Sequence, residues 1–131
     1  MDQVQIKLIS IWITAIIFGC MFIFQMLLAV GAPLGHMAWG GKLKTLPSSL
    51  RIASTVSALI FLYGIAVVLE SADLIELIHA PKIIQVSVWV FALMFTFSTV
   101  GNYLSKSRLE KRIMTPISLI LSITCFIIAL S

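Results

Sequence analysis

The chain has 131 residues, of which 60% are hydrophobic and only 11% are charged, and its mean hydropathy is +1.12. Soluble domains average about 45–50% apolar and about 25% charged residues, so this composition excludes an ordinary water-soluble domain. The formal net charge of +4 does not predict a nucleic-acid partner, because the basic residues lie in short segments between apolar runs.

Four apolar runs dominate the chain and predict membrane-spanning helices at 8–30, 51–69, 83–101 and 116–130. A span needs about 20 apolar residues to cross a hydrocarbon core about 30 Å thick, and the first three runs meet this requirement. The fourth run is short, so it needs local thinning of the bilayer or a start nearer Ile113. The expected fold is an all-α, integral membrane four-helix transmembrane bundle, surrounded by the lipid bilayer and forming one domain over residues 1–131.

The first run is expected to remain in the protein as a helix. Its apolar stretch is much longer than the roughly 7–15 residues of a signal-peptide core. Gly31 suits a left-handed cap at the end of this helix, and Pro33 prevents its continuation. Gln25 is its strongest polar side chain and lies in the half nearest the first loop.

The loop at 31–47 is the least ordinary segment and provides most of the candidate binding residues. These are His36, Trp39, Gly40 and Gly41, followed by Lys42 and Lys44. Successive backbone N–H groups around a Gly-Gly pair can form an anion-binding concavity, which nearby lysines would favour. Turn-forming glycines, an interfacial Trp and topology-setting lysines explain the same segment without a ligand. No GxxxxGK[ST] or GxGxxG pattern predicts nucleotide binding.

The second helix is expected to begin after Pro47, with Ser48 or Ser49 as its N-cap. Arg51 opposes the macrodipole at this helix start. Two interpretations of Arg51 follow: contact with lipid phosphates by snorkelling, or recognition of an anionic substrate.

The segment 71–80 alternates apolar and polar residues, and predicts one or two turns of amphipathic helix in the membrane interface. A plain extension of the second helix is the alternative. Four ionisable residues lie in or beside the segment 71–80, namely Glu70, Asp73, Glu76 and His79. These side chains favour a solvated polar face over a cation site, which usually needs more oxygen ligands in a fixed cage.

The third helix follows Pro81 and carries Asn102 near its end, where a hydrogen bond to Gln25 is expected to join the first and third helices. The fourth helix is expected to begin with Thr115 as N-cap and Pro116 at the first helical position. Small residues recur on one face of this helix, which predicts close helix packing. They are Ser118, Ser122, Cys125 and Ala129.

The basic residues predict the orientation in the membrane, because lysine and arginine are retained on the cytoplasmic side. Seven of the nine lie in or beside the loops 31–50 and 102–115, namely Lys42, Lys44, Arg51, Lys106, Arg108, Lys111 and Arg112. Both loops are therefore expected in the cytoplasm, with both termini outside the cell membrane.

No ionisable residue is expected in the middle of a span, which argues against proton-coupled exporters and pumps. Catalytic, metal-binding and cofactor motifs are also missing from the sequence. The small-residue stripes favour a non-enzymatic membrane protein that acts through helix–helix contact, as an accessory, regulatory or immunity-type subunit or as a homo-oligomer.

Two alternatives remain open from the sequence. The first is a small oligomeric transporter or channel whose site involves Gln25, Arg51, Asn102 and the first loop. The second is a membrane enzyme that acts on a lipid or quinone through His36, Trp39 and Arg51.

Overall fold

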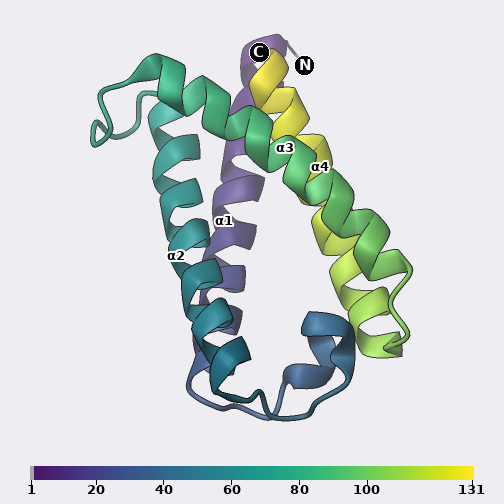
Figure 1. Cartoon of the computed structure of the whole chain (residues 1–131). Helices are drawn as coiled ribbons and strands as arrows, with labels where there is room; N and C mark the ends of the chain where they lie inside the picture. Colours follow the sequence, from purple (N-terminus) through teal and green to yellow (C-terminus); the bar gives the residue numbers. More distant parts are fainter. Residues whose placement is uncertain (1) are drawn as a thin grey trace.

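The computed structural model describes residues 2–131 and contains four long helices. They are α1 (Gln3–Ala29), α2 (Ser48–Ser71), α3 (Pro81–Tyr103) and α4 (Thr115–Leu130), and a π-helical turn, η3 (Glu110–Met114), leads directly into α4 (Figure 1). All four are long and apolar enough to cross a membrane when α4 is counted from Glu110. The protein is therefore an all-α, multi-pass membrane protein, and the predicted fold class is confirmed.

The helices form two pairs, with α1 packed along α2 and α3 packed along α4. Figure 1 shows that the pairs meet near the two termini and diverge toward the opposite end of the bundle. Two short 3-10 turns, η1 (Gly35–Met37) and η2 (Trp39–Gly41), lie between the separated ends. The first loop thus folds inward between the helix pairs.

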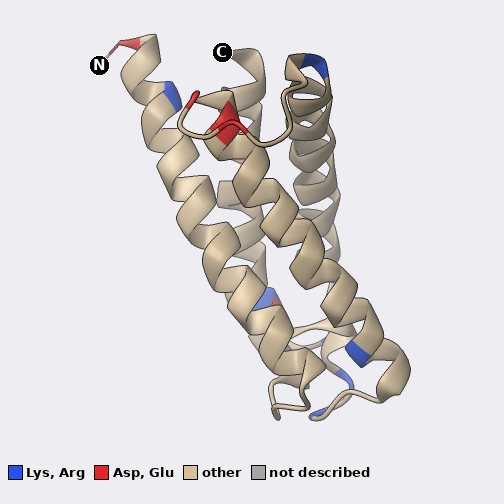
Figure 2. Cartoon of the chain, turned by 90° about the vertical axis from the view of Figure 1, so that its left-hand side faces the viewer, with Lys and Arg blue, Asp and Glu red and all other residues tan. Residues whose placement is uncertain are grey.

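Charge divides the bundle into two ends (Figure 2). We define the basic end as the one that carries residues 30–47 and 104–109. The acidic end carries both termini and residues 72–80, and most Asp and Glu residues lie there.

Phenylalanine rings fill the centre of the bundle. The Phe18 ring of α1 is fully buried and lies 5.4–5.6 Å, centroid to centroid, from Phe61, Phe91 and Phe95. Gly64 makes room for this ring, because a Cβ at that position would lie 2.6 Å from Phe18 Cε2. The helices α1, α2 and α3 therefore share one aromatic core.

Hydrogen bonds between side chains join neighbouring helices. Three pairs lie at 2.7 Å: Thr14–Thr124 between α1 and α4, Tyr63–Ser87 between α2 and α3, and Thr96–Ser122 between α3 and α4. Lipid offers no hydrophobic drive for helix association, so such bonds and close packing over small residues stabilise the bundle. The small stripe of α4 is buried at Ser118, Ser122 and Cys125.

The expected helix at 71–80 is wrong: α2 ends at Ser71, and residues 72–80 form an irregular loop. The Glu70 carboxylate accepts backbone hydrogen bonds at 2.8–3.3 Å from Leu77, Ile78 and His79. Because these N–H groups bind a side chain, they are not available for a helical ladder. Glu70 is buried rather than part of a solvated polar face.

The expected N-cap of the fourth helix is also wrong. Thr115 is not an N-cap: its Oγ1 is buried without a hydrogen-bond partner, and the π-turn of residues 110–114 precedes it. Pro116 cannot donate to the carbonyl one turn earlier, and its ring crowds that carbonyl. A wider π-turn at this point lets the helix continue through the proline. The second helix does begin after Pro47, but no side chain caps it.

Candidate functional site

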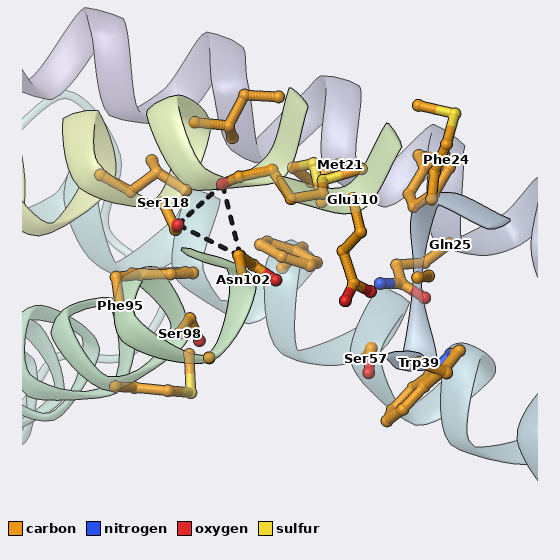
Figure 3. Close-up of a pocket in the computed structure, with 18 of the residues that line it drawn as sticks. Met21, Phe24, Gln25, Trp39, Ser57, Phe95, Ser98, Asn102, Glu110 and Ser118 are labelled. Atoms are coloured by element: carbon orange, nitrogen blue, oxygen red, sulfur yellow. Dashed lines mark hydrogen bonds between the residues drawn. The ribbon is translucent and has the colours of Figure 1, made fainter. Parts of the chain in front are cut away.

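A cavity of about 340 Å³ lies between the two helix pairs toward the basic end, and all four long helices contribute to its lining. Most of the wall is apolar, with aromatic and methionine side chains prominent (Figure 3). The polar side chains in the lining are Gln25, Ser57, Ser98, Asn102, Glu110 and Ser118, with the indole of Trp39 beside them. A largely apolar hollow with a few polar groups is the usual form of a small-molecule site.

Glu110 is the charged residue of this lining, and no lysine, arginine or histidine is present in it. Its side chain is only 6% exposed, and in Figure 3 its carboxylate points toward the amide of Gln25. The backbone N–H of Gly40 donates to Glu110 Oε2 at 3.2 Å. An ionisable residue enclosed in a membrane bundle is expensive to bury and is therefore a candidate for function.

The π-turn explains why Glu110 is enclosed rather than solvated. The sequence places this residue in a loop, whereas the structure places it in the first turn of a continuous helix. Turns of π-helix inside α-helices occur frequently at functional sites. We did not predict Glu110 as a site residue. The signal was the spacing of Glu110, Met114 and Ser118 at intervals of four, which continues the buried face of α4.

Gln25 and Asn102 line the same cavity, but they do not bond to each other as expected. Asn102 Nδ2 donates to Met114 O at 3.3 Å and to Ser118 Oγ at 3.2 Å, so it joins α3 to α4. Gln25 Oε1 is buried and has no hydrogen-bond partner. Since buried polar atoms are almost always paired, this oxygen requires an explanation.

Trp39 lies at the inward-folded first loop and lines the cavity. Its φ of +53° is in the left-handed region, which a large side chain rarely adopts, and the next two residues also have positive φ, at +84° and +71°. The indole Nε1–H donates to Ser54 Oγ at 2.9 Å. This turn therefore aims an indole at α2 and a backbone N–H at Glu110.

His36 and Gly41 lie in the same loop but do not line the cavity. His36 Nδ1–H donates to the Gly41 carbonyl at 2.8 Å, and the His36 carbonyl accepts a hydrogen bond from the Ser107 hydroxyl. A Cβ at Gly41 would also collide with Ser107. These two residues hold the two loops of the basic end together.

Arg51 also lies outside the cavity. Its Nε donates to Leu46 O at 2.9 Å, and its guanidinium rests against Gly31, just beyond the end of α1. A cation is favourable at a helix C-terminus, which offsets its unfavourable position at the start of α2. This arrangement supports a role in closing the loop between the two helices.

A second cavity, of about 480 Å³, lies at the acidic end, where Lys7, Asp73, Glu76 and His79 are among its lining residues. The carboxylate of Glu70 faces it but is already bonded to three backbone N–H groups. Among residues 2–131, no group of three or more His, Cys, Asp or Glu side chains could hold a metal ion. The cavity at the basic end is therefore the stronger candidate.

The chain contains no motif that explains this combination of an enclosed carboxylate, an unpaired amide oxygen and an inward-folded glycine turn. Searches against protein-family models, curated proteins and solved structures return no match. The function of the cavity is therefore inferred from its geometry alone.

Proposed function

We propose that the protein is a small transporter-type membrane protein that binds an amphiphilic small molecule in the cavity at its basic end. One observation carries this proposal: an apolar hollow between the helix pairs encloses Glu110 and leaves Gln25 Oε1 without a partner. Leaving a buried acceptor unpaired costs about 1–3 kcal/mol, which a ligand with hydrogen-bond donors would recover.

The size of the cavity agrees with a small ligand. Small-molecule sites usually enclose about 300–1,000 Å³, and this one, at about 340 Å³, lies at the lower end. In Figure 3 the amides of Gln25 and Asn102 lie on either side of the Glu110 carboxylate, whereas most of the remaining lining is apolar. A ligand with one polar end and a compact apolar body matches this division.

The stripe of small residues on α4, which favours an accessory subunit, faces into the bundle. Ser118, Ser122 and Cys125 are buried inside the bundle, and Gly64 accommodates the Phe18 ring. Because these features pack the chain against itself, they do not form a surface for a partner. Association with another membrane protein or a second copy stays a prediction, and cross-linking in native membranes tests it.

The orientation proposed for this function places the basic end in the cytoplasm and the termini outside the plasma membrane. Seven of the nine lysines and arginines support it. The variants Leu43→Cys and Leu109→Cys introduce thiols at exposed positions of the basic end. Neither thiol should react with an impermeant maleimide added to intact cells, and both should react after the cells are opened. Labelling of intact cells would invert the orientation.

The cavity-filling variant Ser98→Leu tests ligand binding, with Val100→Leu on the exposed side of α3 as its matched control. Each protein is purified from native membranes in mild detergent, and the small molecules bound to it are extracted and identified by mass spectrometry. A molecule should accompany the wild type and Val100→Leu but not Ser98→Leu. Equal recovery from all three proteins would contradict binding in this cavity. The identified molecule is then loaded into proteoliposomes to measure its transport.

A further inference from the structure

We infer that the ligand of this cavity is an organic cation, a protonated amine on an apolar body, with its nitrogen held by the oxygens of Glu110 and Asn102. The inference rests on the proposed function, because it names the chemical class that the same cavity takes. Three independent properties of the lining support it: its charge, its hydrogen-bonding groups and its walls.

The charge of the lining is negative and has no partner within it. The Glu110 side chain is only 6% exposed, and no basic side chain lines the cavity. An ionised carboxylate is costly to bury unless it is paired and hydrogen-bonded. Gly40 supplies one backbone hydrogen bond, to Oε2 at 3.2 Å, and among residues 2–131 no further bond reaches the carboxylate. A cationic ligand completes the pair.

The side chains beside Glu110 are the amides of Gln25 and Asn102. In Figure 3 the amide nitrogen of Gln25 faces the carboxylate, and its oxygen points away from it. Gln25 Oε1 is buried and unpartnered, and Gln25 itself is 9% exposed. Asn102 uses its Nδ2 for two bonds to α4, so its oxygen points away from them, toward the space in front of Glu110 (Figure 3). A protonated primary amine has three N–H donors and no acceptor, which suits the carboxylate oxygens of Glu110 and the amide oxygen of Asn102.

The walls suit the rest of such a molecule. Phe24, Phe61 and Phe95 line the cavity together with the indole of Trp39. Aromatic faces attract organic cations, and the attraction is strongest where water is excluded. Methionine side chains from several elements complete the wall and adapt to irregular apolar shapes.

Two other ligand classes fit the cavity less well. A bare metal ion would leave the apolar volume empty, and residues 2–131 offer no cluster of three or more His, Cys, Asp or Glu side chains to hold it. An anion would be repelled by Glu110, because the lysines of the basic end do not line this cavity.

The test compares matched amines and alcohols, which differ in charge but share a skeleton. The probes are 2-phenylethylamine and 4-phenylbutylamine with 2-phenylethanol and 4-phenylbutanol, and binding to the purified full chain is measured by equilibrium dialysis. Binding to the cavity-filled variant Ser98→Leu is subtracted as background. At least one amine should bind the wild type more tightly than its alcohol.

Glu110→Gln, which keeps an oxygen for Gly40, should weaken amine binding about tenfold or more. The matched control Glu76→Gln, at the acidic end, should bind as the wild type does.

The outcomes separate the inference from the proposed function. If each alcohol binds the wild type as tightly as its amine, the cavity binds small molecules but the cation is wrong. If Glu110→Gln retains full amine affinity, the inference is likewise overturned. If no probe binds and no endogenous molecule is lost from Ser98→Leu, the proposed function fails as well. The comparison of amine with alcohol needs only the wild type, so it stands even if Glu110→Gln is unstable. Glu110→Asp provides a second variant that retains the charge.

Discussion

The backbone N–H of Gly40 donates a hydrogen bond to the carboxylate of Glu110, although the two residues are 70 positions apart in the sequence. This bond joins the first loop to the turn that starts the fourth helix. The Ser107 hydroxyl supports the same junction by donating to the His36 carbonyl. Both loops of the basic end therefore form one structure that covers the cavity. Glu110 lies at the centre of this structure, and it is also the charged residue in the lining of the cavity.

Removing this acceptor should release the first loop. Glu110→Ala is expected to make trypsin cleave after Lys42 and Lys44, which are both exposed, severalfold faster than in the wild type. Glu110→Gln keeps an acceptor oxygen and should be cleaved at the wild-type rate. The measurement is a digestion time course in detergent, followed by mass spectrometry of the fragments. Glu76→Ala controls for the loss of a carboxylate elsewhere. Equal rates for all four proteins would show that the bond does not hold the loop.

The bond between Trp39 Nε1 and Ser54 Oγ, at 2.9 Å, is expected to fasten the same loop to α2. Ser54 is fully buried, so Trp39→Phe leaves its hydroxyl without this donor. A double-mutant cycle with Trp39→Phe and Ser54→Ala should give a coupling of about 0.5–1.5 kcal/mol in the free energy of unfolding. The measurement is SDS-induced unfolding in mixed micelles.

Trp12→Phe is the control for this cycle, because Trp12 lies on an exposed face of α1 and is 48% exposed. Combined with Ser54→Ala, it should show additive effects. A coupling as large as that of the Trp39 cycle would mean that the effect comes from tryptophan loss in general, and not from the bond.

The four spans are predictable from the sequence because lipid imposes a local rule: each crossing helix must be long and apolar. The ends of the helices depend on contacts that no local rule describes. Glu70 takes up three N–H groups of residues 77–79, so a segment with an amphipathic pattern becomes a loop. Pro116 resembles a helix start in sequence, yet a π-turn carries the helix through it.

The candidate site is only partly predictable for the same reason. The sequence alone indicates three polar or aromatic residues near one end of the spans, Gln25, Trp39 and Asn102. The structure brings all three to one cavity. Glu110 appears in the sequence as one charge in a charged loop. Its enclosure depends on the π-turn and on the inward fold of a loop about 70 residues earlier, and a reading of local patterns includes neither.

Gly64 should be the least replaceable glycine of the helices. Gly64→Ala places a Cβ 2.6 Å from Phe18 Cε2, inside a core where that ring contacts three others, and is expected to destabilise the protein by about 1–3 kcal/mol. Gly19→Ala is the matched control, because nothing lies within 4 Å of its Cβ. It should leave stability unchanged or raise it by up to about 1 kcal/mol. Equal losses for both variants in SDS unfolding would contradict the close packing of Phe18.

The π-turn before Pro116 should tolerate the deletion of one residue once the proline is removed. A π-turn holds one residue more than an α-turn, so deleting Ile113 restores α-helical spacing while Glu110 and Ser118 both keep facing the cavity. Pro116 would then lie in a regular helix, which costs about 3 kcal/mol. Deletion of Ile113 alone should therefore destabilise the protein, and Pro116→Ala should restore stability and ligand binding. Deletion of Ile120, within regular α-helix, rotates one side of α4 against the other by about 100° and should not be rescued by Pro116→Ala. If Pro116→Ala rescued both deletions, or neither of them, the proline would not be the cause of the π-turn. The reason is that only a turn that already contains an extra residue can lose one without changing which side chains face the cavity.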